Sequence, residues 1–305
     1  MKRRILVSGS TGLVGREVVS ALAASGAEVI GFSRHPDSAA GQAIAADILA
    51  GGGLDDVMAS GADTMVHAAW DVSPGYWTSA ANDDWRRASS DMVRRFRDAG
   101  GRRVVLVGTC AEYDWSAEAT AGDLSETGSR FRPHTPYGMA KYELRRELQD
   151  WSEPIDGFSV ASGLVFFPFG GPERPERLVP SIIRGLLAGE DVPLTSGNQV
   201  RDLMHVASIG RALAALASGE VSGPVNIATG AGTSLRDVAG MIRSMIPGGG
   251  RLEFGALPDR AGEPLRLVAD VSRLRQQAGY REALSLEDGM KAAISYWRDR
   301  RDAAR

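Results

Sequence analysis

Near its start the 305-residue chain reads Ile5-Leu6-Val7-Ser8-Gly9-Ser10-Thr11-Gly12-Leu13-Val14-Gly15. A short apolar run leads into a turn with glycine at every third position, and apolar residues then recur at helical spacing. A strand, a glycine turn and a helix in this order present backbone N–H groups and a helix N-terminus to a phosphate. Gly9 permits the tight turn, Gly12 lets the backbone approach a pyrophosphate, and Gly15 lets the helix pack on the strand. The stretch predicts a dinucleotide site rather than a plain strand-to-helix turn, with contacts from Gly9, Ser10, Thr11, Gly12, Leu13, Val14 and Gly15.

The end of the next predicted strand indicates which dinucleotide is bound. The strand covers residues 28–32 and is followed by Ser33 and Arg34. An acidic residue at this place would hold the ribose 2′-OH of NAD, whereas a guanidinium pairs with a 2′-phosphate. We therefore predict that Ser33 and Arg34 favour NADP(H), with NAD(H) as the possible alternative. A solvated surface arginine is the other interpretation of Arg34.

The alternation of strands and helices continues through the first half of the chain. Residues 64–69 are predicted to form a strand, 85–99 an arginine-rich helix, and 103–107 a buried parallel strand. This order indicates an α/β fold, a Rossmann-type doubly wound parallel sheet with chemistry at the carboxyl ends of its strands. Further cofactor contacts are predicted for Asp47 and Ile48 on the adenine side and for Ala68 and Ala69 along the chain. His67 is interpreted as a packed strand-end residue.

Three polar side chains are candidates for the chemistry. Thr109 follows the strand at 103–107, where a hydroxyl can hydrogen-bond a substrate carbonyl. Tyr137 and Lys141 stand four residues apart where a helical pattern begins, so both leave one helix face. A free tyrosine has a pKa near 10, and a neighbouring ammonium lowers it toward the range needed for acid–base work. The pattern predicts a proton donor or acceptor, although such a spacing also arises by chance on surface helices.

Composition narrows the class of protein. The chain has 43% hydrophobic and 24% charged residues and a net charge of −3, which favours neither a nucleic-acid nor a membrane partner. Cys110 is the single cysteine, which excludes an intrachain disulfide and fits a reducing compartment. No apolar run approaches membrane-spanning length, so we predict a cytoplasmic protein. No metal site is predicted.

These motifs together resemble the extended short-chain dehydrogenase/reductases, and more narrowly the NAD(P)-dependent sugar-nucleotide epimerase/dehydratase family. The glycine turn, Thr109 and the Tyr137–Lys141 pair carry the resemblance in the first half of the chain. It extends through the second half, which contains Arg201-Asp202-Leu203-Met204-His205-Val206, Val225-Asn226-Ile227-Ala228-Thr229-Gly230, Asp259-Arg260-Ala261-Gly262-Glu263-Pro264, Asp270 and Leu286-Glu287-Asp288-Gly289.

The resemblance implies roles for individual residues. Tyr137 would be the acid–base group, and Lys141 would lower its pKa and hold the nicotinamide ribose. Thr109 would polarise the reacting C–O group. Arg201 and Arg260 would bind a nucleotide diphosphate, because a guanidinium suits it in bidentate geometry. A salt bridge inside the smaller lobe, for instance to Asp202 or Glu263, is the alternative for each arginine.

Departures from the family pattern narrow the activity. Sugar-nucleotide 4,6-dehydratases follow the threonine with an acidic pair, whereas this chain has Cys110 and Ala111 there. Glu112 comes one residue late and is expected to point to the other face. A helix asparagine of the family aligns with Trp85, to which we assign no role. The run 166–169, including Phe167 as a substrate contact, packs either near the nicotinamide or sugar or as ordinary core aromatics.

The organisation predicted from these features has two parts. Residues 1–165 form the NAD(P)-binding Rossmann domain, with returning segments near 200–228, and residues 166–305 mainly form a smaller substrate-binding lobe. The expected activity is NADPH-dependent reduction of a nucleotide-linked 4-keto-(deoxy)sugar, with Tyr137 as proton donor. The alternatives are an NAD-dependent sugar-nucleotide 4-epimerase and a non-catalytic NADP-binding protein. The resemblance also implies a homodimer, formed through helices near 85–99 and 138–151.

Overall fold

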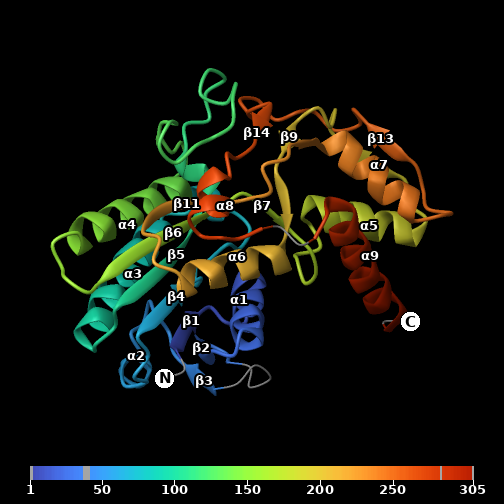
Figure 1. The fold of residues 1–305 in the computed structure, drawn as a ribbon. Helices are drawn as coiled ribbons and strands as arrows, with labels where there is room; N and C mark the ends of the chain where they lie inside the picture. Colours follow the sequence, from blue (N-terminus) through green and yellow to red (C-terminus); the bar gives the residue numbers. More distant parts are fainter. Residues whose placement is uncertain (1–2, 37–41, 282–283, 304–305) are drawn as a thin grey trace.

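A seven-stranded, all-parallel sheet forms the centre of the molecule (Figure 1). The structure is a computed structural model, which describes residues 3–36, 42–281 and 284–303. Its strand order is β11-β6-β5-β4-β1-β2-β3. The order reverses direction at β1, where the crevice for a dinucleotide opens in folds of this type. The sheet confirms the predicted Rossmann-type fold. Its strands are β1 (Arg4–Ser8), β2 (Glu28–Ser33), β3 (Gln42–Ala45), β4 (Thr64–His67), β5 (Arg103–Thr109), β6 (Ser159–Val165) and β11 (Gly223–Ile227).

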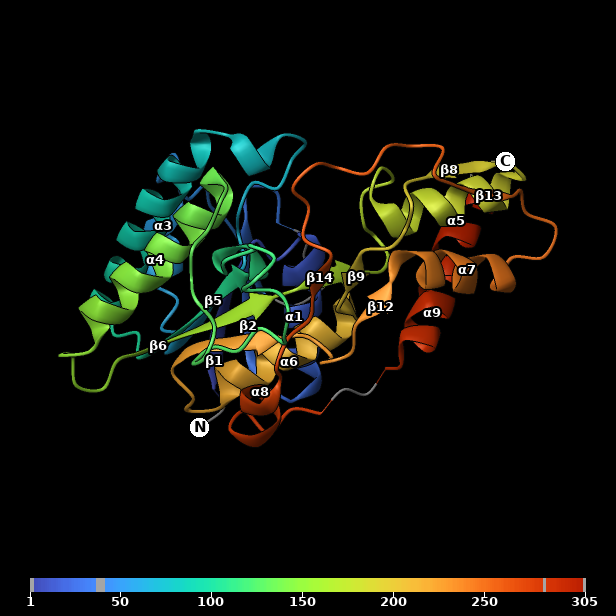
Figure 2. The same cartoon turned by 90° about the horizontal axis from the view of Figure 1, so that it is seen from above.

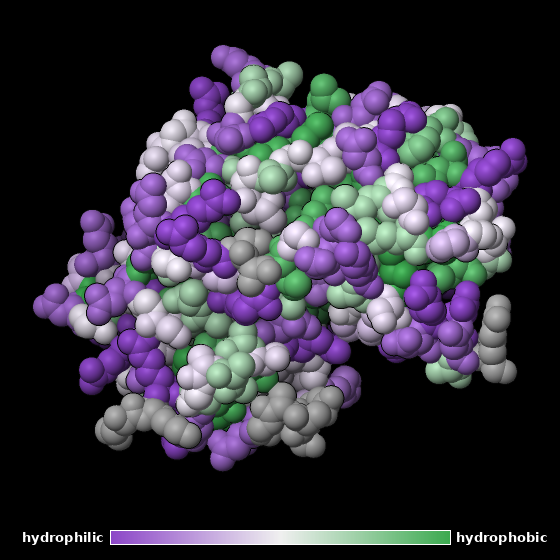
Figure 3. Space-filling view, turned by 45° about the vertical axis from the view of Figure 1, so that its right-hand side comes forward, coloured by the Kyte–Doolittle hydropathy of each residue, from purple (hydrophilic) through white to green (hydrophobic). Residues whose placement is uncertain are grey.

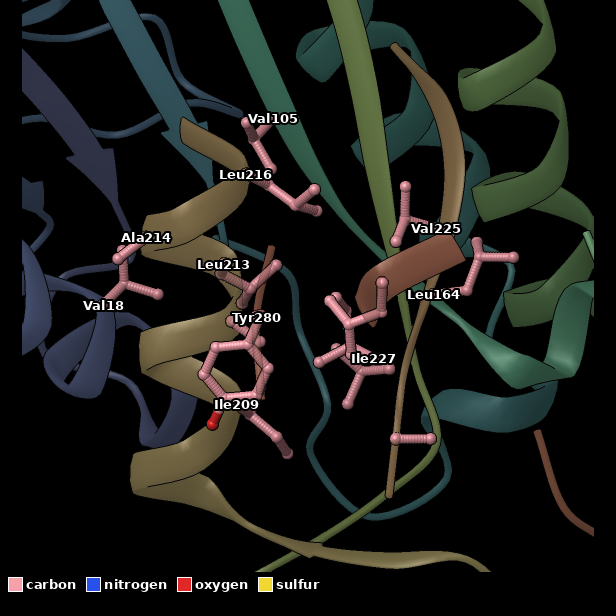
Figure 4. Packing of buried hydrophobic residues seen from close by; sticks show 14 of the residues in the cluster. Val18, Val105, Leu164, Ile209, Leu213, Ala214, Leu216, Val225, Ile227 and Tyr280 are labelled. Carbon is pink, nitrogen blue, oxygen red and sulfur yellow. The ribbon is translucent and has the colours of Figure 1, made fainter. Parts of the chain in front are cut away.

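Helices cover both faces of this sheet (Figure 2). On one face lie α1 (Leu13–Ala24) and α6 (Val206–Ser218), and on the other α2 (Leu54–Met58), α3 (Ala81–Asp98) and α4 (Pro136–Ser152). Alternation along β1 explains the two layers, since Ile5 and Val7 pack with α1 and α6 while Leu6 packs with the α3 layer. Figure 4 shows Ile209, Leu213 and Leu216 of α6 reaching toward the strands.

The helix α3 begins four residues earlier than predicted. Asp83 and Asp84 occupy its first turn, where carboxylates are favoured by the positive end of the helix dipole. The earlier start brings Asn82 into the helix as a buried residue. Two 3-10 turns, η2 (Tyr76–Thr78) and η3 (Cys110–Glu112), follow β4 and β5 along the chain.

A second hydrophobic core lies to one side of the sheet, at the right of Figure 1. It is built from α5 (Leu178–Ala188), β8 (Val192–Leu194), α7 (Leu235–Met245), β13 (Leu252–Phe254) and α9 (Leu286–Ala303). Short strands pair where the chain passes between the two cores: β7 (Phe167–Phe169) with β10 (Leu203–His205), and β9 (Val200–Arg201) with β12 (Thr233–Ser234) and β14 (Arg266–Leu267). The helix α8 (Ser272–Gln276) contributes Leu274 to the core beside the sheet.

The surface in Figure 3 carries many hydrophilic residues with hydrophobic ones among them. Across the described ranges, none of the helices combines the length and apolar character needed to cross a membrane.

Candidate active site

The glycine turn after β1 is closely packed against the chain that leaves β4. Gly9 has a φ of +63°, and a Cβ on it would lie 2.8 Å from the Cα of Ala69. A Cβ on Gly15 would lie 2.1 Å from the Gly9 carbonyl oxygen. Ser8 Oγ accepts hydrogen bonds from the N–H groups of Ala68 and Ala69, each at 3.0 Å. The turn is thus held at the carboxyl ends of two adjacent parallel strands.

The N-terminus of α1 fits an anionic group. The helix begins at Leu13, and its N-cap residue Gly12 provides no side-chain cap for the first-turn N–H groups. Such N–H groups are the donors that bind pyrophosphate at the start of a helix. Because Gly9 and Gly15 leave no room for a side chain, the backbone itself forms the surface of the turn.

His67 lies at the end of β4 behind this turn and is fully buried. Its ring nitrogens lie 2.7 Å from Ser8 Oγ and 2.8 Å from Ser89 Oγ. Burial lowers the pKa of His67 to about 3, and the nearby Lys141 charge acts in the same direction. A neutral histidine bound by two hydroxyls agrees with the interpretation of a packed strand-end residue.

The predicted adenine and 2′-phosphate contacts lie beyond β2 and β3. Arg34 is exposed, and Ser33 Oγ is buried without a hydrogen-bond partner. Asp47 uses Oδ1 to accept the N–H groups of Leu49 and Ala50, at 2.9 and 3.1 Å. Ile48 is buried in the α3-side core. Asp47 therefore caps its own turn, and Ile48 acts in packing.

Thr109, at the end of β5, is nearly buried and caps η3. Its Oγ1 accepts the N–H of Ala111 at 3.2 Å, and its own N–H donates to Glu112 Oε1 at 3.3 Å. The Thr109 side chain also hydrogen-bonds Tyr137. The two predicted catalytic hydroxyls are thus brought together from β5 and α4.

Tyr137 and Lys141 lie in the first turns of α4, which begins at Pro136 with Thr135 Oγ1 accepting the N–H of Gly138. Lys141 Nζ donates to the Val107 carbonyl at 2.9 Å. Burial lowers the pKa of Lys141 to about 7, against the opposing charge of Glu112. Lys141 is therefore poised to change charge near neutral pH.

The expected lowering of the Tyr137 pKa by Lys141 is wrong for this arrangement. Burial raises the pKa of Tyr137 well above its ordinary value, the nearby Tyr76 hydroxyl adds to that rise, and the hydrogen bond with Thr109 opposes it. The physical reason is enclosure, because a phenolate surrounded by aromatic rings loses its hydration.

The rings around Tyr137 were not predicted from the sequence. Tyr76 and Trp77 from η2 meet the Tyr137 ring edge-on, with centroids 4.9 and 5.4 Å away. Trp70, directly after Ala69, lies 6.4 Å from Tyr137 and has Lys141 Nζ 3.8 Å from its ring centroid. A lysine ammonium over an indole face is an attractive contact. The aromatic residues crowded between 70 and 77 were the only signal for this enclosure.

Asn82 is a further residue of the site that the sequence did not reveal. Its Oδ1 accepts the Trp70 indole N–H at 2.9 Å, and its Nδ2 donates to the carbonyls of Tyr76 and Ser79 at 2.7 and 2.8 Å. Trp85, left without a role above, lies 5.9 Å from the Trp70 ring and lines the same face. One buried amide therefore fixes both the indole over Lys141 and the turn over Tyr137.

The positions where a dehydratase acid pair would stand carry no acid. Cys110 and Ala111 are buried, and burial raises the pKa of the Cys110 thiol to about 12. Glu112 is fully buried and turned to Arg145, with 2.6 Å between its Oε2 and the guanidinium Nε. Glu112 lies in a 3-10 turn rather than in the strand-like segment that was expected, and both its oxygens are engaged, by Arg145 and by the Thr109 N–H.

Arg201, Arg260 and Phe167 are the other residues that were predicted to contact the substrate. Arg201 is nearly buried and pairs with Glu263 at 2.7 Å, which is the salt bridge left open as the alternative above. Its guanidinium also lies 5.3 Å from the centroid of the half-buried Phe167 ring. Arg260 is exposed. Phe166 and Phe169 are buried in the two cores, which favours the core interpretation for them.

Comparison with known proteins places this site in a family. Residues 5–228 match the model of the NAD dependent epimerase/dehydratase family. The chain belongs to that family. This confirms the resemblance inferred from its motifs, and it makes the chain an NAD(P)-dependent enzyme of the oxidoreductase and epimerase type.

The relatives of this epimerase/dehydratase family member are named for several different reactions. The chain is 26% identical to a Streptomyces dTDP-4-dehydro-6-deoxy-D-allose reductase, and the match covers 97% of this chain and 96% of that protein. A dTDP-glucose 4,6-dehydratase of Streptomyces niveus is 25% identical, with coverage of 98% and 94%. The structure of MoeE5 in complex with UDP-glucose and NAD is similar with a TM-score of 0.82 and 27% identity, over 98% of this chain and 99% of that one.

No group of three or more metal-ligating His, Cys, Asp or Glu side chains occurs in the part of the chain that the structure describes.

Proposed function

We propose that this protein is an NADPH-dependent reductase of a nucleotide-linked 4-keto-(deoxy)sugar. The observation that carries the proposal is the pairing of Thr109 with Tyr137 beside Lys141, while Cys110 and Ala111 occupy the positions of an acidic pair. The hydroxyls of Thr109 and Tyr137 are sufficient for proton transfer to one substrate oxygen, as a carbonyl reduction requires. Elimination of water needs a further general acid and base.

The chemistry divides simply between cofactor and protein. Bound NADPH supplies the hydride that reduces the keto carbon. Thr109 hydrogen-bonds the carbonyl oxygen and Tyr137 donates its proton to that oxygen as negative charge develops there. Lys141, whose Nζ lies 3.8 Å from the Trp70 ring centroid, offers an ammonium next to this exchange and would hold a ribose hydroxyl of the bound cofactor.

The preference for NADPH rests on Arg34, an exposed guanidinium at the end of β2 where NAD-binding chains of this fold carry an acid. Support for a nucleotide sugar comes from the deoxysugar reductase among the relatives and from MoeE5, solved with UDP-glucose and NAD. In this proposal Arg201 exchanges the Glu263 carboxylate for the diphosphate of the substrate, and Arg260 adds a second positive charge.

A sugar-nucleotide 4-epimerase is the second candidate. A UDP-glucose 4-epimerase of Lacticaseibacillus casei is 26% identical over 62% of this chain and 62% of that protein. Its chemistry would use the same Thr109 and Tyr137 but return the hydride to the sugar, so no NADPH would be consumed. We further propose a cytoplasmic homodimer that contacts its partner through α3 and α4.

The test is a turnover screen of dTDP-, CDP-, GDP- and UDP-linked 4-keto sugars with NADPH and with NADH. The proposal expects oxidation of NADPH with at least one of them. Purified protein that carries tightly bound NAD and oxidises no NADPH with any of these substrates would contradict it. Tyr137→Phe is expected to lose turnover by a factor of about 10² to 10⁴, the contribution of a general acid, while still binding cofactor.

A further inference from the structure

A buried ion pair joins the two segments that carry the catalytic hydroxyls. Glu112 has no exposed surface and Arg145 is 3% exposed, and 2.6 Å separates Glu112 Oε2 from Arg145 Nε. Glu112 stands three residues after Thr109 in η3, and Arg145 stands four residues after Lys141 in α4. The pair therefore joins η3, directly after β5, to the middle of α4.

The carboxylate has a second, separate contact on the side of Thr109. Its Oε1 accepts the Thr109 N–H at 3.3 Å, which with the Thr109–Ala111 hydrogen bond closes a reciprocal cap. A Cβ on Gly108 would lie 2.7 Å from Oε1, so the carboxylate packs directly on the strand backbone. The Arg145 guanidinium in turn lies 4.3 Å from the centroid of the Phe131 ring. Both partners are held from several sides.

The charges around Lys141 give this pair a consequence for the reaction. His67 from β4, Cys110 and Glu112 from η3, and Tyr137 and Arg145 from α4 are the titratable groups set near it. Burial keeps His67, Cys110 and Tyr137 neutral at neutral pH. Cys110 and Tyr137 would also be anions if they ionised, but burial raises their pKa values, so Glu112 is the anion expected among these five. Its charge opposes the loss of the Lys141 proton.

Arg145 determines whether that anion persists. Burial raises the pKa of Glu112, while the charge and hydrogen bond of Arg145 lower it, followed by the Thr109 N–H. A buried carboxylate without such a partner takes up a proton instead of remaining charged.

We propose that Glu112 and Arg145 are positioning residues of this active site: the carboxylate fixes the Thr109 backbone and keeps the Lys141 ammonium charged beside Tyr137, and Arg145 keeps the carboxylate ionised. The inference rests on the proposed function only in assigning the reaction to Thr109, Tyr137 and Lys141.

The chain offers an unusually direct test, because it contains only three lysines, at positions 2, 141 and 291. Lysine labelled with ¹³C at Cε gives one NMR resonance for each, and a pH titration of the Lys141 resonance reports its charge without any substrate. In Glu112→Gln, which keeps an acceptor for the Thr109 N–H, the Lys141 midpoint is expected to fall by about one unit, the lower end of the effect of a nearby opposite charge. The alkaline limb of kcat/KM is expected to move down by the same amount.

Glu147→Gln is the matched control on the same helix. Glu147 is half-buried and pairs with Arg86 and Arg94 at 3.1 Å each, on the α3 side. Its loss is expected to leave both the Lys141 midpoint and the pH profile where they are. This separates the proposal from a general effect of removing an acid from α4.

The double variant Glu112→Gln/Arg145→Gln serves where the single change unfolds the protein, because it leaves no unpaired buried charge. Its Lys141 midpoint is also expected to fall, but by less than in the single variant, because removal of the Arg145 charge acts in the opposite direction. A folded variant of either kind with the wild-type Lys141 midpoint overturns the proposal. Absence of ketoreductase turnover with a shifted midpoint would instead refute the proposed function alone.

Discussion

Replacing Gly15 by alanine tests how tightly the glycine turn is built. The added Cβ would lie 2.1 Å from the Gly9 carbonyl oxygen, about 1 Å closer than contacts that real Cβ atoms make. The obstacle is backbone, so no side-chain rotation relieves it. Such overpacking costs about 1–3 kcal/mol, against a gain of about 1 kcal/mol because alanine is the better helix former.

The larger effect is expected on cofactor affinity. A shift of the turn by about 1 Å misaligns the first-turn N–H groups of α1, and hydrogen bonds to a charged group contribute about 1.5–3 kcal/mol each. Loss of two of them, about 3–6 kcal/mol together, weakens binding by a factor of roughly 10² to 10⁴. Titration of NADPH fluorescence measures the affinity, and a thermal melt of the apoprotein measures the stability.

Gly240→Ala is the control, since Gly240 also lies within a helix, α7, and a Cβ there meets nothing within 4 Å. It is expected to raise the melting temperature by a few degrees at about 1 kcal/mol and to leave NADPH binding unchanged. Wild-type NADPH affinity in Gly15→Ala would refute the reasoning, because the turn would then tolerate the displacement that the geometry demands.

Three other perturbations have defined outcomes. Arg34→Ala is expected to weaken NADPH binding about 10-fold or more while leaving NADH binding unchanged, because only a 2′-phosphate pairs with the guanidinium; equal losses for both cofactors would contradict this. Asn82→Ala leaves an indole N–H and two carbonyls without their partner and is expected to lower the free energy of unfolding by about 2–3 kcal/mol in a denaturant titration. The exposed Asn198→Ala should change it little. Burial raises the pKa of Glu173 to about 7, so its ionised form destabilises the folded state as pH rises from 4.5 through 7. Glu173→Gln should therefore raise the melting temperature at pH 8 but not at pH 4, and the exposed Glu176→Gln should do neither.

Much of the site could be predicted from the sequence because it depends on residues that are close together in the chain. A glycine turn after a strand needs only neighbouring residues, and its geometry here follows from positive φ at Gly9 and the missing Cβ of Gly15. The i, i+4 spacing likewise places Tyr137 and Lys141 on one face, where both contact the Trp70 ring. Periodicity located the strands and helices around them to within a few residues, as the start of α3 at Ala81 shows.

Contacts between segments that are far apart in the chain could not be predicted from the sequence. The salt bridge of Arg201 with Glu263 joins residues 62 positions apart, and the sequence left it as one of two alternatives. Asp202 and Asn226 matched family segments, yet their side chains act in structure: Asp202 accepts the N–H groups of Thr229 and Gly230, and Asn226 accepts the Tyr113 hydroxyl. A sequence motif can indicate that a residue has a role, but it does not show which distant residue its side chain will contact.

The sequence by itself determined the family, the parallel sheet, the glycine turn and the identity of the hydroxyl and ammonium groups, because each depends on spacing within a few residues. Only the tertiary structure decided the environment of those groups. It enclosed Tyr137 in rings from η2, set Trp70 over Lys141 through Asn82, and buried Glu112 against Arg145. Ionisation depends on solvation and on charges brought from other elements, so the proton chemistry of this site is a property of the fold rather than of any one stretch.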